Sequence, residues 1–120
     1  MVILRFLKVI NKRIIIMLTL ELDKQTENRF SKLLNIYGSN YTNLINSMFD
    51  YRINELKKGM RNIELDLLSY EKKYNMNSSD FYKDYENGFF GENSHNNDFI
   101  IWSGEYESYL EFQNELKQLI

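Results

Sequence analysis

The sequence of 120 residues contains no cysteine, no proline and one histidine, His95. Without cysteine the chain forms no disulfide and offers no thiolate ligand and no cysteine nucleophile. One histidine alone gives no convergent ligand set for a metal ion. Without proline, nothing interrupts long helices. We therefore expect a mainly α-helical chain with no metal and no cofactor.

Other chemistry is equally sparse. Gly88 and Gly91 flank two phenylalanines and lack the lysine of a phosphate-binding loop. No serine has a base partner other than His95, which nothing positions. Carboxylates such as Glu105 recur at helical spacing, as on a solvated face. We predict that the protein is not an enzyme and has no small-molecule substrate.

Long apolar runs are also missing. The longest uncharged one near the N-terminus, Ile14–Leu18, spans five residues, far fewer than the roughly 18 needed to cross a bilayer. We expect a cytoplasmic protein without a membrane span. Residues 1–16 carry four basic side chains, including Lys12 and Arg13, and no acid. They form either a basic arm or an untranslated stretch before a true start at Met17.

Charge is distributed unevenly along the chain. The net charge is −2, yet residues 75–120 carry nine acids against only Lys83 and Lys117. Such a division predicts an acidic C-terminal part that meets a different partner from the neutral-to-basic front half.

The segment Met17–Asp23 alternates strictly, with Leu18, Leu20 and Leu22 on one face. Period-two alternation predicts a half-buried β-strand. A lone strand leaves its backbone groups unpaired, so we expect it to pair with its copy in a second subunit.

A helix should follow, capped at its start by Asp23 and at its end by Gly38. Asn40 is the expected N-cap of a second helix, Tyr41–Tyr74. Eight apolar residues of that helix follow a 3.5-residue period without losing phase at Gly59: Phe49, Ile53, Leu56, Met60, Ile63, Leu67, Tyr70 and Tyr74. We expect a helix of about 50 Å to be too long to be covered by its own chain. We therefore predict a homodimer in which the three strand leucines and the first six seam residues are buried.

This strand–helix–helix order over residues 17–58 resembles the ribbon-helix-helix family of small DNA-binding repressors and antitoxins, with residues 59–74 as a helical extension. The resemblance implies that a paired ribbon enters the DNA major groove and that the start of the second helix holds a phosphate. The DNA-contacting residues would be Lys12, Arg13, Thr19, Glu21, Lys24, Ser39 and Asn40. Glu21 departs from the family pattern, because a carboxylate facing a polyanion usually weakens binding.

Residues 75–120 hold ten of the eighteen aromatic residues. Ser78 or Ser79 should cap a short helix that stops at Gly88, Gly91–Asn97 should be a polar loop, and an amphipathic helix should follow. The aromatics are either a core that folds back on the long helix, or anchors that are buried only against a basic partner. On the second interpretation the partner-binding residues are Phe81, Tyr82, Tyr85, Phe89, Phe90, Phe99, Trp102, Tyr106 and Tyr109.

The order of motifs in this tail is similar to that of a family of small bacterial antitoxins: Tyr70-Glu-Lys-Lys-Tyr74, Ser78-Ser-Asp-Phe-Tyr82, Glu86-Asn-Gly88, and Asp98-Phe99 with Trp102 and Tyr106. The resemblance implies a type II antitoxin that dimerises through its front half and neutralises a basic, nuclease-like toxin through residues 75–120. Promoter DNA is a further expected partner. The alternatives are a stand-alone transcriptional repressor and a helical adaptor or scaffold that does not bind DNA.

Overall fold

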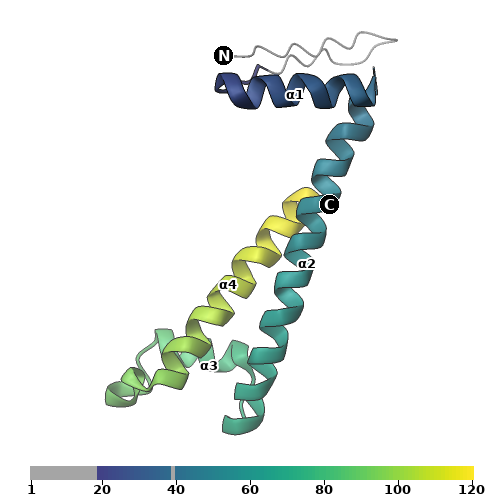
Figure 1. Cartoon of the computed structure of the whole chain (residues 1–120). Helices are drawn as coiled ribbons and strands as arrows, with labels where there is room; N and C mark the ends of the chain where they lie inside the picture. The colour runs from purple at the N-terminus through teal and green to yellow at the C-terminus, as the bar shows by residue number, and fades with distance from the viewer. Residues whose placement is uncertain (1–18, 39) are drawn as a thin grey trace, which may run out of the picture. The chain divides into compact units, whose positions relative to one another are not determined.

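The computed structural model of the chain describes residues 19–38 and 40–120, which are almost entirely helical (Figure 1). Its elements are α1 (Lys24–Tyr37), α2 (Tyr41–Tyr74), α3 (Ser78–Glu86), the short 3-10 helix η1 (Gly91–His95) and α4 (Asn97–Leu119). The predicted mainly helical fold is confirmed. No helix in these ranges is long and apolar enough to cross a membrane. Residues up to 47 and residues 48–120 form two compact units, which we describe separately.

The predicted N-terminal strand lies at the edge of the described chain. Thr19 to Asp23 have no strand conformation, and Met17 and Leu18 lie outside the described residues. A strand is defined by backbone hydrogen bonds to a neighbouring strand, and the described part of one chain provides no such neighbour. The strand, and its pairing with a second copy, therefore stays a prediction.

The ends of α1 and α2 follow the predicted capping residues. The carboxylate of Asp23 accepts a hydrogen bond from the backbone N–H of Thr26 at 2.7 Å, and this bond lowers the pKa of Asp23. Gly38 ends α1 with φ of +63°, a region that favours glycine. The side chain of Asn40 accepts from the N–H of Asn43 at 3.2 Å, and α2 spans Tyr41–Tyr74 as predicted.

The start of α3 differs from the prediction. Asn77, and not Ser78 or Ser79, is the N-cap, because its side chain accepts from the N–H of Asp80 at 2.8 Å. Ser78 is buried, and its hydroxyl instead accepts a hydrogen bond from Trp102 Nε1 at 2.8 Å. The N-cap of α3 is therefore Asn77, the residue before Ser78.

The segment between α3 and α4 also corrects a prediction. Gly91–His95 is a 3-10 helix within the predicted polar loop. The helix after it starts at Asn97, since the side chain of Asn96 accepts from the N–H of Asp98 at 2.8 Å. The predicted C-terminal helix is present and runs to Leu119.

The core of residues 48–120 is aromatic. Phe81 of α3 and Trp102 of α4 are both 0% exposed, and their rings stack with centroids 3.7 Å apart and planes 4° from parallel. Leu67 of α2 completes the buried cluster. Partly buried side chains surround it: Ile63, Tyr70, Tyr74, Met76, Tyr85, Phe90, Phe99, Tyr106 and Tyr109. Three helices thus share one core, in agreement with the core interpretation of the tail aromatics.

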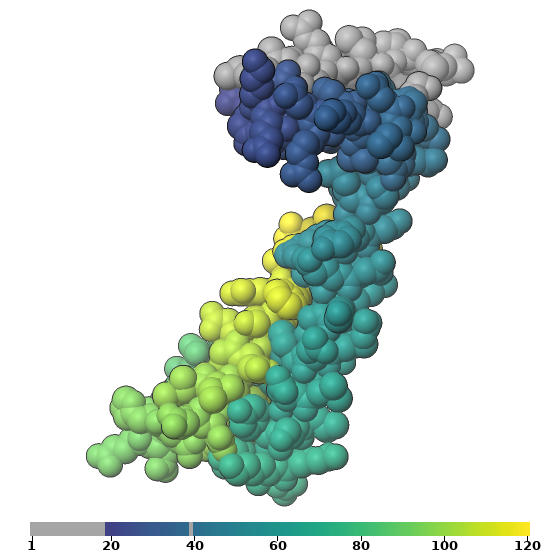
Figure 2. Space-filling model, in the orientation of Figure 1, coloured from purple at the N-terminus to yellow at the C-terminus, as the bar shows by residue number. Residues whose placement is uncertain are grey.

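Helix α4 runs antiparallel along α2, and their surfaces meet along most of α4 (Figure 2). At one end Asp98 binds Lys73, and at the other Glu115 binds Arg52. Between them, Phe112 packs over Gly59, where an added Cβ would lie 2.7 Å from ring atom Cε2. Gly59 therefore leaves α2 continuous and makes room for an aromatic ring.

The heptad seam of α2 is covered largely by the same chain. Leu56 and Leu67 are 1% and 6% exposed, although we expected them to be buried by a second copy. The reason is that α4 folds back along α2, so the length of α2 gives no reason to expect a dimer over this stretch. Ile53, Met60 and Ile63 are half-buried, while Phe49 stays 48% exposed. Dimerisation itself remains a prediction.

Candidate partner-binding surface

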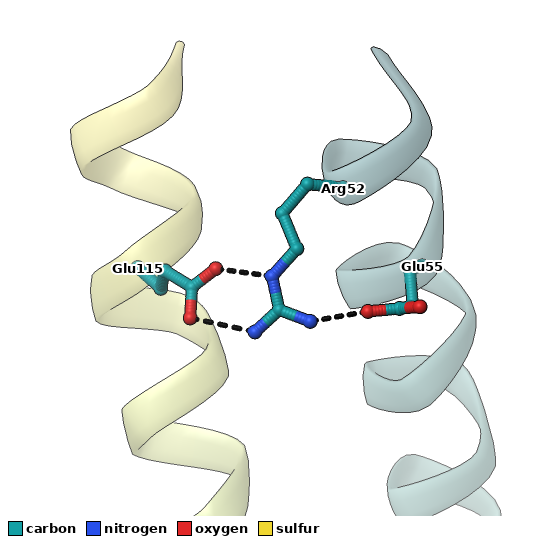
Figure 3. A network of polar contacts seen from close by, with 3 residues as sticks. All are labelled: Arg52, Glu55 and Glu115. Carbon is teal, nitrogen blue, oxygen red and sulfur yellow. Dashed lines mark hydrogen bonds and ion pairs between the residues drawn. The ribbon is translucent and has the colours of Figure 1, made fainter. Parts of the chain in front are cut away.

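Several tail acids are used within residues 48–120. Glu115 of α4 accepts two hydrogen bonds from the guanidinium of Arg52, at 2.5 Å and 2.8 Å, and the same guanidinium binds Glu55 (Figure 3). Hydrogen bonding to Arg52 lowers the pKa of Glu115. This carboxylate is therefore paired with α2, although its side chain stays 41% exposed.

Asp98 is occupied in the same way at the start of α4. One of its carboxylate oxygens accepts from Lys73 Nζ and from the hydroxyl of Tyr74, both at 2.5 Å. These two bonds lower the pKa of Asp98, that with Lys73 most. Asp98 and Glu115 thus both pair with basic residues of α2.

A third acid, Glu105, faces Asp66 across the hairpin. Burial raises the pKa of Glu105 first, and the neighbouring carboxylate of Asp66 raises it further. Its Oε2 atom is buried without a hydrogen-bond partner. The two carboxylates line a shallow cleft with Ser69 and Tyr70, and within the described residues no group of three His, Cys, Asp or Glu side chains could hold a metal ion.

Three of the remaining tail acids act on one tyrosine, Tyr82. Burial raises the pKa of Tyr82 most, and the charges of Glu86, Glu107 and Glu111 raise it further. The three carboxylates, from α3 and α4, are exposed. The ring of Tyr82 lies 5.2 Å from that of Tyr106. We call Glu86, Glu107, Glu111, Tyr82 and Tyr106 the acidic patch.

The acidic patch combines the two features that bind a cationic side chain. Carboxylates pair with lysine and arginine, bidentately in the case of arginine, and a tyrosine ring attracts a cation over its face. Leu110, on the turn between Glu107 and Glu111, is 37% exposed and adds apolar area. The patch can therefore bind a basic protein surface.

The predicted partner-binding aromatics divide by exposure. Phe81 and Trp102 are fully buried in the single chain, so a partner could reach them only if the core opened. Phe89 is 73% exposed. The others are half-buried: Tyr82, Tyr85, Phe90, Phe99, Tyr106 and Tyr109. Only the pair at Tyr82 and Tyr106 lies within the acidic patch.

Sequence reasoning missed the acidic patch. Glu107 and Glu111 lie four residues apart on a helix, which places them on one face, but this spacing equally describes an ordinary solvated face. Glu86 comes from another helix, and only the packing of α3 on α4 brings it to the other two. Exposed Ile100 and Ile101 of α4, at 48% and 50%, were also overlooked.

Four of the seven predicted DNA-contacting residues lie in the described part of the chain. Thr19, Glu21, Lys24 and Asn40 are exposed, and the side chain of Asn40 is engaged as the cap of α2. The other three, Lys12, Arg13 and Ser39, lie outside the described residues. Of the four described residues only Lys24 is basic, and DNA contact stays a prediction.

Comparison with protein-family models, with curated proteins and with solved structures finds no match.

Proposed function

We propose that the protein is an antitoxin of a type II toxin–antitoxin pair, located in the cytoplasm. Residues 48–120 bind and neutralise a basic, nuclease-like toxin. The front half dimerises and represses the antitoxin's own promoter. The front half and the tail keep the roles expected from the sequence. The tail, however, acts as a folded unit with a binding surface, and not as an arm that folds only when it binds its partner.

The acidic patch is the observation that carries this proposal. Glu115 and Asp98 are held by Arg52 and Lys73, whereas Glu86, Glu107 and Glu111 lie exposed beside a tyrosine pair. Enzymes that cleave nucleic acid have basic clefts for the phosphate backbone. A surface that presents carboxylates on a rigid helical frame can occupy such a cleft and speeds the encounter with it.

Dimerisation through the front half is supported by α1. Among the described residues the apolar side chains of this helix are only partly covered: Leu33 and Tyr37 are 37% and 36% exposed, and Ile36 is 79% exposed. An apolar helix face of this kind needs a second surface to cover it. In the ribbon-helix-helix arrangement that surface comes from a second subunit.

The test is co-expression with the product of the adjacent gene, scored by growth and by co-purification. Replacing Glu86, Glu107 and Glu111 together by lysine should abolish both rescue of growth and co-purification, because like charges then meet across the interface. The matched control replaces three other tail acids together by lysine, namely Asp80, Asp84 and Glu92. This variant should retain both rescue of growth and co-purification. Rescue that survives the first replacement would remove the acidic patch from the proposal.

DNA binding distinguishes the proposed antitoxin from the alternative, a helical adaptor. An autoregulating antitoxin shifts its own promoter fragment in a gel at about 100 mM salt, and the shift weakens as salt rises. A helical adaptor gives no shift under these conditions, and neither growth nor the adjacent gene depends on it.

A further inference from the structure

Helix α2 carries a second regular stripe on the side away from its core seam. Lys58, Arg61, Leu65, Leu68 and Lys72 follow one another at intervals of three or four residues, which places them on one helix face. Leu65 is 69% exposed and Leu68 is 46% exposed, and the three basic residues are exposed as well. We call this face the outer stripe of α2; it is basic at both ends and apolar in the middle.

Helix α4 carries a stripe of the opposite sign on its own outer side. Ile100, Gly104, Glu107 and Glu111 also follow intervals of three or four residues. Ile100 is 48% exposed, and a Cβ added at Gly104 would meet nothing within 4 Å. This outer stripe of α4 is apolar at its start, has a notch at the glycine and is acidic beyond it.

The two stripes match when the helices are antiparallel. Leu68 then faces Ile100 and Leu65 enters the notch at Gly104. Seven residues further along each helix, Arg61 faces Glu107, since the same rise of about 10.5 Å separates the paired positions on both helices. Lys58 finally meets Glu111. Apolar side chains thus meet apolar ones, and Arg61 and Lys58 each meet an acid, while Lys72 lies opposite the start of α4.

We propose that the outer stripe of α2 docks on the outer stripe of α4 of a second copy of this chain. The stripe of α2 cannot pair with itself, because an antiparallel copy centred on the two leucines would bring Arg61 against Lys72, and like charges are unfavourable at such positions. A face with exposed leucines between basic residues needs an acidic and apolar occupant, and α4 supplies both.

The docked surfaces are different on the two copies, so the contact is head to tail. Each added copy leaves one free stripe of each kind, and assembly continues beyond two chains. Within one chain α2 and α4 are already antiparallel neighbours. The assembly is therefore a layer in which the two helices alternate. It does not depend on the toxin, although a partner bound at Glu107 and Glu111 would displace the neighbouring copy.

The experiment is sedimentation velocity of the full chain over a wide concentration range. The wild-type chain should form species larger than a dimer. Arg61→Glu alone and Glu107→Arg alone should each raise the concentration needed for these species by at least about tenfold. The chain carrying both changes should regain them, because the charges are exchanged across every contact. Lys83→Glu, which changes the net charge equally on α3, should assemble like the wild type.

A second variant separates docking from folding. Gly104→Gln fills the notch with a residue of better helix propensity, so the thermal midpoint should rise while assembly beyond a dimer is lost. A wild-type chain that never exceeds a dimer, single variants that assemble normally, a double variant that stays dissociated, or a Gly104→Gln chain that assembles like the wild type would each overturn the proposal.

Discussion

Helix α1 and the unit of residues 48–120 differ in how far their apolar side chains are buried. None of the residues of α1 is buried, whereas α2, α3 and α4 enclose Phe81 and Trp102 completely. Both regions are amphipathic by sequence, yet among the described residues only the second region encloses its own apolar side chains. The proposed dimer contact therefore belongs to the front part of the chain and not to the long helix.

The largest effect expected is at the aromatic core. Phe81→Ala should lower the free energy of unfolding of residues 48–120 by about 3–5 kcal/mol, because it leaves a cavity beneath Trp102. The matched change Phe89→Ala removes a ring that is 73% exposed and should stay within about 0.5 kcal/mol. Urea unfolding measures both. Equal losses at the two positions would mean that the site of Phe81 is no better packed than the exposed position of Phe89.

Replacing two helix glycines by alanine should change the stability of the protein in opposite directions. Gly59→Ala places a methyl group 2.7 Å from the ring of Phe112 and should cost about 1 kcal/mol after the gain in helix propensity. Gly104→Ala meets nothing and should stabilise by about 0.5–1 kcal/mol. Thermal unfolding compares them. Stabilisation at both glycines would show that α4 does not pack on α2 at Gly59.

A smaller effect is expected from Glu105, and it depends on pH. The raised pKa of Glu105 means that the folded state holds its proton more tightly than the unfolded state. Its contribution to stability is present below the unfolded-state pKa and is lost as pH rises through the folded-state pKa. Glu105→Gln should therefore stabilise the protein at neutral pH, and this advantage should shrink on acidification.

The control for Glu105 is Glu107→Gln, the same change on the exposed face of α4. Asp98 and Glu115 have lowered pKa values, so their contributions act in the opposite direction and are lost as pH falls. Comparing each variant with the wild type at the same pH in urea removes this background. An advantage of Glu105→Gln that grows on acidification would contradict the packing of Glu105 against Asp66.

The smallest effect on residues 48–120 should come from α1. Leu34→Glu places a charge on the apolar face of this helix, so at concentrations too low for assembly through α2 and α4 we expect loss of the dimer, with a change within about 0.5 kcal/mol in the stability of residues 48–120. Lys32→Glu, on an exposed position of the same helix, should retain the dimer. Sedimentation and hydrogen exchange at α3 and α4 measure the two quantities. Lost protection in those helices would mean that the units are not independent.

Features that depend on neighbouring residues were predictable from the sequence. Asp23, Gly38 and Asn40 gave the ends of the first two helices because capping bonds join residues at most a few positions apart. The prediction that Ser78 or Ser79 caps α3 was wrong, because the hydrogen-bond partner of Ser78 is distant in the sequence. Its hydroxyl bonds to Trp102, which lies 24 residues away, and no local pattern reveals that competition.

Features that depend on what covers a face were less predictable. A 3.5-residue period shows that Leu56 and Leu67 are buried, but it does not say whether α4 or a second chain buries them. The acids of α4 show the same limit. Glu105 and Glu115 point to α2 while Glu107 and Glu111 stay exposed, and only the packing of the two helices distinguishes them.

The chain has one tryptophan, and its position gives a spectroscopic consequence. Trp102 is 0% exposed, is stacked on Phe81 and donates its N–H to Ser78. Its fluorescence is therefore an optical signal of residues 48–120 alone, whereas far-ultraviolet circular dichroism records the helices of both units. The separation between the two unfolding curves directly measures how strongly the units are coupled.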